Sequence, residues 1–568
     1  MRGGGIEKNH SSSKKLVLSL VTISFLSSYS YATDTTINDS KTDTQTVSGA
    51  SNTLVIGSVG SVTISNPTNN SNKNKQAILF QPSSSTSTFL NQGTLIGGSN
   101  TASVQVGVNR TGGATIQTFD NQGIIGNGTS RFGVTVWGKD GSKSTINNFS
   151  NSGTISSNNN EAIYLGNTGI KTFTNSGVIN SNNNRGININ SGVTIETFTN
   201  SGIINSTGTL PNGSQGYING SVNIIGSKDS ITSIKNFNNS GTISSEHIHG
   251  VNLRYTTIDN FNNSGIIKTN GTQRHGSTAF TDSGFRMTYA YVKTFENTGT
   301  ISGFMGVVLN GSKIDQFTNK KTIMATQNND LSFGIMIGVI NRNGTSTIET
   351  LKNEGIITSK GQGIVISNNN KIETLINNGT IQADKNGIMF HNYDDVVGPA
   401  NLGKITIGSN GIIKAGNDAI HIDGSKYDIV AQGIDVESGG KLEGGNAGIY
   451  IGGGKEINAQ IKIEGTVTGE TAGIVNEGVI GGNTSSGSTG GIVISGGSVS
   501  SSSGRSGIVN QGNGSISGEI KVESGGSVEG GITNTGNGSI SGSITVASGG
   551  KLDSITNTST SSTGISGS

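Results

Sequence analysis

The sequence contains no cysteine, only four prolines and one tryptophan, and aromatic residues make up 5% of its 568 positions. Without cysteine, disulfide bonds cannot stabilise an exported fold, so backbone hydrogen bonds must do so. The scarcity of proline excludes a proline-rich or collagen-like chain. The 90 glycines and 30% hydrophobic residues argue against a single large core, whereas recurring Ile and Val exclude plain disorder. A periodic, strand-rich fold remains.

Residues 1–32 have the pattern of a secretory signal peptide. Lys14 and Lys15 precede an apolar run at 16–26 that is too short to span a bilayer, and small residues lead to a cleavage site after Ala32. Removing this segment takes away four cations and one acid, which changes the net charge from +2 to −1. Because the exported chain has neither a net positive field nor an aromatic-interleaved basic patch, the sequence predicts no nucleic-acid partner.

A ten-residue phrase recurs along the chain, as TFTNSGVINS at 172–181 and TFTNSGIINS at 197–206. Aligned on their aromatic residue, the copies place Phe at positions 89, 119, 149, 173, 198, 237, 261, 295 and 317, then Leu at 351 and 375. The unit of about 24 residues corresponds to three strands of about five residues and three turns. Apolar and polar residues alternate within each run, which predicts half-buried strands, and Asn-x-Gly supplies the corner between them.

The repeats predict an all-β solenoid of stacked parallel coils, with Phe on Phe, Ile on Ile and Asn on Asn. We expect Ile195, Phe198 and Ile204 to face the interior and Glu196 to face solvent. Roughly twenty coils would form a rod on the order of 100 Å long at the usual strand spacing.

The position two residues before the aromatic alternates in charge between neighbouring repeats, as Lys171 and Glu196, Lys235 and Asp259, and Lys293 and Asp315. Glu349 followed by Glu373 breaks this rule. Exposed pairs contribute only about 0.2–1 kcal/mol each, so the alternation indicates register more than stability. Scattered solvated charges are the alternative interpretation.

The style of the repeats divides the chain into four parts. After the signal peptide, 33–76 are a cap or lead-in strands, and 77–404 are coils with Phe-x-Asn-x-Gly phrases and inserted loops. From 405 to 568 the coils become glycine-rich, with Ser-Gly-Gly corners and almost no aromatics. The period of 24 residues persists there, for example between the GNGSISG segments at 512 and 536.

Together, the signal peptide, the absence of cysteine, the Asn-x-Gly coils and the Ser-Gly-Gly coils resemble the passenger region of an adhesin-like type V autotransporter. The likeness covers 33–568, rests on architecture and repeat style, and assigns no catalytic residue. It implies a right-handed parallel β-helix that a C-terminal translocator barrel carries across the outer membrane. No such barrel follows in this sequence. The expected explanations are a fragment, an early-terminated reading frame, or a barrel encoded elsewhere.

The sequence therefore predicts a surface-exposed or secreted adhesin-like protein that presents loops from a stiff rod. Its expected partners are a translocator barrel and an unidentified ligand on a host or neighbouring cell, and no cofactor is expected. It would lie at the cell surface, in the outer membrane or outside the cell, or in the periplasm if the barrel is lost. A polysaccharide-cleaving β-helix enzyme and a structural surface-coat component are the alternatives.

Four short motifs resemble chemical sites, but their context favours structural roles. Gly398–Lys404 has the spacing of a phosphate-binding loop, but Ile405 stands where Ser or Thr is needed. Thr281–Gly284 is similar to a serine-protease nucleophile segment, and a polar turn is the better interpretation. His247 and His249 share a strand face without a third metal ligand, which favours surface histidines.

The fourth motif, GNDAIHID at 416–423, places Asp418, His421 and Asp423 close together. Paired carboxylates could act as general acid and base on a glycosidic bond. An ordinary coil strand with its polar residues outward is the favoured alternative, so no catalytic residue is predicted.

One inserted segment, 269–291, concentrates aromatic and basic residues in a chain that is poor in aromatics. Arg and Tyr frequently contribute most of the binding energy at interfaces. We therefore expect a lateral contact patch made by Arg274, His275, Phe280, Phe285, Arg286, Tyr289 and Tyr291. The alternatives are that several of these side chains pack against the rod, or that Phe285 and Tyr289 belong to an ordinary coil strand.

Export should remove residues 1–32, because their charge, apolar run and small residues match the signal-peptidase pattern. N-terminal sequencing of exported protein is expected to begin at Thr33. A mature chain that retains 16–26 would contradict this prediction.

Overall fold

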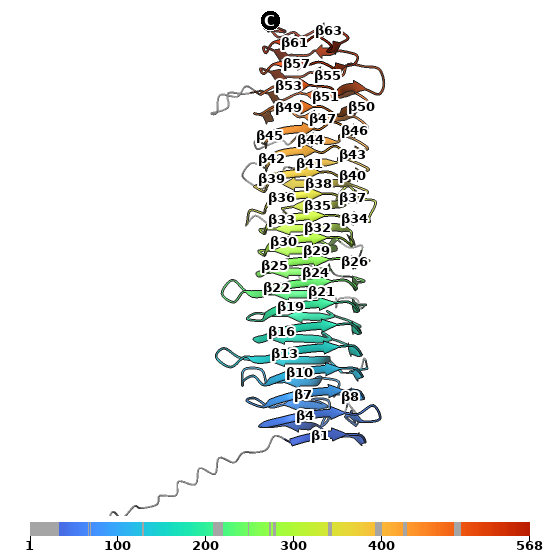
Figure 1. Cartoon of the computed structure of the whole chain (residues 1–568), viewed down its shortest axis with the longest axis vertical. Helices are drawn as coiled ribbons and strands as arrows, with labels where there is room; N and C mark the ends of the chain where they lie inside the picture. Colours follow the sequence, from blue (N-terminus) through green and yellow to red (C-terminus); the bar gives the residue numbers. More distant parts are fainter. Residues whose placement is uncertain are drawn as a thin grey trace, which may run out of the picture.

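The computed structural model describes residues 33–65, 68, 70–127, 130–207, 220–247, 249–271, 274–275, 280–338, 344–367, 369–391, 400–423, 429–481 and 490–567. Over these residues the chain forms strands and turns without any helix, stacked into one long rod (Figure 1). The predicted signal peptide lies outside the described residues.

The chain runs in turn through three sheets, which we name A, B and C in the order the chain visits them. Each coil contributes one strand to each sheet, except that from Glu456 onward the part of each coil in sheet A is divided into two short strands. In one coil these are β16 (Thr168–Asn175) in sheet A, β17 (Val178–Ser181) in sheet B and β18 (Ile187–Ile189) in sheet C. β16 pairs in parallel with β19 (Thr194–Asn200) of the next coil. Over the described residues sheets B and C contain 19 strands each. The predicted parallel β-helix is confirmed.

Sheet A carries the repeated phrase in register. Phe173 pairs with Phe198 and Asn175 with Asn200, as the repeated decapeptide predicted. Its strands in this part of the rod are β7 (Ser85–Asn91), β10 (Thr115–Asn121), β13 (Ser144–Asn151), β16, β19, β22 (Thr232–Asn239), β25 (Thr256–Asn263), β30 (Tyr291–Asn297), β33 (Lys313–Asn319), β36 (Thr347–Asn353) and β39 (Lys371–Asn377).

Nine phenylalanines stack in a single interior column from Phe89 to Phe317. Neighbouring ring centroids lie 4.5–4.8 Å apart, which is the spacing of the strands themselves. The rings are nearly parallel from Phe119 onward and at most 1% exposed. Leu351 and Leu375 continue the column, as the sequence predicted.

Eleven asparagines form a second buried column at the corner between sheets A and B. The Nδ2 of every asparagine but the last donates to the Oδ1 of the asparagine in the next coil at 2.7–2.8 Å. The amide of Asn239 shows the pattern, since it also donates to the Gly241 and Ile266 carbonyl oxygens at 3.3 Å. This asparagine ladder comprises Asn91, Asn121, Asn151, Asn175, Asn200, Asn239, Asn263, Asn297, Asn319, Asn353 and Asn377, all at most 1% exposed.

A second, shorter asparagine ladder lies at a different corner. Asn476, Asn510, Asn534 and Asn557 end strands of sheet C, and their amides are linked at 2.7–2.9 Å. From Asn476 to Asn557 the rod therefore has the same kind of amide ladder at the C–A corner, while Ser-Gly-Gly turns occupy its A–B corner. In both ladders the first Oδ1, on Asn91 and Asn476, is buried without a hydrogen-bond partner among the described residues.

The first ladder fixes the length of the A–B corner. From β7 to β39, every strand of sheet A is separated from the next strand of sheet B by two residues, as between Asn200 and β20 (Ile203–Ser206). A longer corner would break the contact between one coil's amide and the next coil's backbone. Inserted residues therefore lie at the other two corners, for example 138–143 between sheets C and A and 270–282 between sheets B and C.

The alternating charges occupy equivalent positions of neighbouring strands, but they do not pair as expected. Lys171, Glu196, Lys235 and Asp259 are exposed, and no ion pair joins them within the described chain. The exception, Glu349, instead pairs with Lys313 at 2.5 Å, and Lys313 also contacts Asp315 at 3.1 Å. The alternation thus marks register without forming a salt-bridge ladder.

Replacing Phe198 with Asp should unfold the rod locally, whereas replacing Glu196 with Lys should have almost no effect. Phe198 is fully buried, Ile195 and Ile204 beside it are 2% and 0% exposed, and Glu196 is exposed, as predicted. An unpaired buried charge costs several kcal/mol. Limited proteolysis of both variants tests this, and equal loss of protease resistance would contradict the strand assignment.

Replacing Asn239 with Ala should destabilise the rod far more than the same change at its neighbour Asn238. Asn239 accepts from Asn200 and donates to Asn263, both at 2.8 Å, whereas Asn238 accepts one bond at 3.0 Å on the outer face. Each buried group left unpaired costs about 1–3 kcal/mol. Urea unfolding should show a large loss for Asn239→Ala and less than about 1 kcal/mol for Asn238→Ala. Equal losses would mean that the ladder contributes nothing specific.

Candidate functional site

The structure divides the predicted contact segment 269–291 between a hairpin and the core. β27 (Arg274–His275) and β28 (Phe280–Thr281) pair antiparallel in a small separate sheet, and the side chains of Arg274, His275 and Phe280 lie outside the described residues. β29 (Ser283–Thr288) is instead a regular strand of sheet C. The segment is therefore partly a true insertion and partly a coil.

Two residues of the predicted patch are not available at the surface. Phe285 is fully buried, and its ring lies edge-on between Phe261 and Phe295, with centroids 4.7 and 5.0 Å away. Arg286 is 2% exposed on the opposite face of β29. The expected contact role is wrong for both, because a regular strand of sheet C begins at Ser283, as the alternative interpretation of Phe285 supposed.

Tyr289 and Tyr291, which follow β29 in the same coil as the hairpin, are partly exposed. Tyr289 stacks on Tyr255, with ring centroids 5.2 Å apart, at the C–A corner. The Tyr291 hydroxyl donates to Asp315 at 2.5 Å. Burial would raise the pKa of Asp315, but the Tyr291 hydroxyl and the Lys313 ammonium hold it below its usual value. That hydrogen bond to Asp315 in turn raises the pKa of Tyr291.

His249 was expected at the surface, but it is fully buried in β24 (His249–Arg254). The Ser283 backbone N–H donates to His249 Nδ1 at 3.1 Å, so this nitrogen is an acceptor, and the Ser283 hydroxyl lies 2.9 Å from it. The polar turn predicted at 281–284 is also wrong, because Ser283 and Gly284 begin β29. Although serine and histidine meet here, both are buried and out of reach of a substrate.

The Asp418–His421 pair links neighbouring coils. Asp418 Oδ2 lies 2.7 Å from His421 Nδ1, and Asp418 Oδ1 accepts from Asn446 Nδ2 and the Ala447 N–H at 2.8 and 2.9 Å. The His421 ring stacks on Tyr450. With both oxygens hydrogen-bonded and its side chain 5% exposed, Asp418 is held as a structural group.

Tyr450 extends this network by one coil, since its hydroxyl donates to Glu477 at 3.0 Å. Burial and then this carboxylate raise the pKa of Tyr450 above its usual value. The segment with the spacing of a phosphate-binding loop, Gly398–Lys404, is likewise structural. Its described residues belong to β42 (Ala400–Ile407), in which Lys404 pairs with Asp435 at 2.6 Å.

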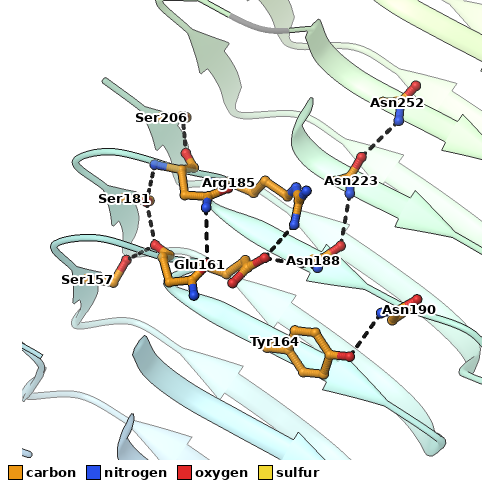
Figure 2. A network of polar contacts seen from close by, with 12 residues as sticks. Ser157, Glu161, Tyr164, Ser181, Arg185, Asn188, Asn190, Ser206, Asn223 and Asn252 are labelled. Atoms are coloured by element: carbon orange, nitrogen blue, oxygen red, sulfur yellow. Dashed lines mark hydrogen bonds and ion pairs between the residues drawn. The ribbon is translucent and has the colours of Figure 1, made fainter. Parts of the chain in front are cut away.

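The outer face of sheet C carries a buried polar network (Figure 2). The alternation of apolar and polar residues had predicted that this face would be exposed. Glu161, only 4% exposed, pairs with Arg185 at 2.5 Å and accepts from Asn188 at 3.1 Å. Asn223 donates to Asn188 at 2.9 Å, and Asn252 to Asn223 at 2.8 Å. This chain of amides ends on the carboxylate, so the buried charge is compensated.

Beside this network lies a pocket of about 350 Å³ where successive coils turn from sheet C to sheet A. Its aromatic wall is Trp137, at the end of β12 (Phe132–Trp137), and Tyr164 of β15 (Ile163–Gly166), with ring centroids 4.2 Å apart. The remaining lining residues are Asn109, Arg110, Gly138, Gly166, Asn167, Asn190 and Ser191. We name this the Trp137 pocket.

Two lining residues of the Trp137 pocket adopt left-handed backbone conformations, Arg110 with φ of 61° and Asn167 with φ of 49°. Non-glycine residues rarely do so, and such conformations gather at functional sites. Gly107, with φ of 68°, allows the preceding loop to approach, because a methyl group there would come within 2.2 Å of the Trp137 carbonyl oxygen. The fold therefore holds these loops against the aromatic wall.

Sequence reasoning missed the Trp137 pocket. The one available signal was the single tryptophan, followed one coil later by the tyrosine of EAIYLG at 161–166. Because a turn rather than a motif brings Arg110 and Asn190 to these rings, no spacing in the sequence identifies them.

Within the described residues, no group of three or more His, Asp or Glu side chains is placed to hold a metal ion. None of these residues forms a helix long and apolar enough to cross a membrane. Comparisons with protein-family models, with curated proteins and with solved structures found no match.

Proposed function

We propose that this protein is an exported, surface-exposed or secreted passenger of the autotransporter kind, which acts as an adhesin-like rod. Its partners would be a translocator barrel and a ligand on a host or neighbouring cell. The observation that carries the proposal is the separation of a uniform core from variable corners. The asparagine ladder keeps one corner constant, and the hairpins and exposed aromatics lie at the other two.

Several features favour contact over catalysis. His249 bonds to Ser283 of the next coil, and Asp418 bonds to His421 in its own coil and to Asn446 and Ala447 of the next, so both acid–base candidates are engaged in the structure of the rod. The Trp137 pocket offers aromatic faces and amides, and none of its lining residues is a carboxylate. A polysaccharide-cleaving enzyme would need a pair of accessible carboxyl groups. A purely structural coat component would not require an accessible aromatic pocket lined by residues with left-handed backbone conformations, as Arg110 and Asn167 have here.

The adhesion test removes the hairpin of the predicted contact segment. The excision must end before Asp282, because Ser283 and Phe285 belong to the core. Gly271 and Asp282, the residues on either side of the excision, lie close enough for a short link to join them. A methyl group on Gly271 would come within 2.2 Å of the Asp282 carboxylate. Replacing 272–281 with Asn-Gly should leave β-content and thermal melting nearly unchanged and reduce the adhesion of cells that display 33–568 on a translocator barrel.

The control shortens the turn at 227–230, which an antiparallel bridge closes at the C–A corner. Cells displaying this variant should adhere as the parent does. Undiminished adhesion after removal of 272–281 would show that the hairpin is not the contact. A lack of adhesion by the parent chain on every cell type tested would contradict the proposed function itself.

A further inference from the structure

We propose that the Trp137 pocket binds a single pyranose unit that carries a carboxylate, as in a terminal or internal acidic sugar of a glycan. The inference deepens the proposed function by naming the ligand class, and it rests on that function only for its biological setting. A pyranose has faces of C–H groups and a rim of hydroxyls. It therefore needs an aromatic wall and surrounding hydrogen-bonding groups at once.

The aromatic wall meets the first requirement. Trp137 and Tyr164 are both partly exposed, and their rings are tilted by 34° to each other, so they form a bent apolar surface. Gly166 keeps this surface open, because a methyl group there would lie 3.0 Å from Tyr164 Cε1 and 3.5 Å from Trp137 Cε3. The volume of about 350 Å³ lies within the usual range for small-molecule sites.

The Tyr164 hydroxyl is oriented for a ligand by its neighbours. Asn190 Nδ2 donates to the Tyr164 hydroxyl oxygen at 2.9 Å, while Asn190 Oδ1 accepts from the Ser191 N–H at 2.8 Å. The Tyr164 hydrogen therefore points away from Asn190, and no acceptor for it occurs among the described residues. Burial raises the pKa of Tyr164, so the hydroxyl keeps this hydrogen at neutral pH.

Further donors around the rings are also uncommitted. Within the described part of the chain, the Trp137 indole N–H and the Asn109 and Asn167 side-chain amides make no hydrogen bond to protein. These groups present donors and acceptors in the mixture that sugar hydroxyls require.

Arg110 determines the charge of the ligand. It is the one charged residue that lines the Trp137 pocket, and it forms no ion pair with any described residue. The nearby carboxylate of Glu161 is already neutralised by Arg185. A guanidinium at the rim of a site without acidic residues favours a carboxylate, which it can bind through two parallel hydrogen bonds.

The single tryptophan makes the test specific to this site. Purified chain 33–568 is titrated with glucuronic acid, N-acetylneuraminic acid and glucose while Trp137 fluorescence is recorded. Saturation-transfer NMR on the same sugars provides a second readout. We expect a saturable emission change with at least one acidic sugar, and at least fivefold weaker binding of glucose.

Variants assign the roles of the groups. Arg110→Gln should weaken binding of the acidic sugar about fivefold and leave glucose unaffected. Tyr164→Phe, which keeps the ring, should weaken binding of both about fivefold through loss of one hydrogen bond. Tyr450→Phe is the matched control, because it removes a tyrosine hydroxyl from the same sheet far along the rod, and it should bind as the parent does.

No saturable response from either readout would overturn the proposal. So would equal affinity for acidic and neutral sugars, or an equal loss in Tyr450→Phe. None of these results would bear on the adhesion of displaying cells, which the removal of 272–281 tests separately. The two proposals can therefore fail independently.

Discussion

The hydrogen bond between the side-chain amides of successive asparagines is the interaction on which the rest of this structure depends. An amide carries both donors and acceptors, so one buried column can satisfy itself from coil to coil while also bonding the backbone that turns around it. Such a column resists any change in corner length, because a shift would leave several buried groups unpaired. A corner of constant length between sheets A and B follows from this constraint, and it keeps the phenylalanines of successive coils in register.

The same constraint explains where the chain varies. At the ladder's corner nothing can be inserted, so hairpins and longer turns lie at the B–C and C–A corners. In the 405–568 region the amide column lies at the C–A corner instead, and glycine turns replace it between sheets A and B. Each ladder begins with a buried unpaired Oδ1, on Asn91 and Asn476, where the preceding coil has Ile56 and Ile451. Asn91 and Asn476 therefore mark the coils at which an asparagine replaces an isoleucine at the corner.

The candidate site shows how a solenoid builds a pocket without a dedicated domain. Coil spacing places Trp137 and Tyr164 in contact, and turns of different length bring Arg110 and Asn190 to them. The adjacent Glu161–Arg185 pair and its amide chain fill the outer face of sheet C with satisfied polar groups. This network lies beside Tyr164 and Asn190 and holds neighbouring coils together there, and such preorganisation would reduce the entropy that a bound ligand costs.

The sequence by itself determined the periodic part of this protein. Because each strand pairs with its own copy, the spacing of Phe173 and Phe198 was enough to predict parallel stacking, register and the inward face. Only the tertiary structure decided what lies outside that period. It buried His249 and Phe285, engaged both oxygens of Asp418, and assembled the Trp137 pocket from four turns. Turn lengths and contacts between non-equivalent residues have no period, so the repeats contain no information about them.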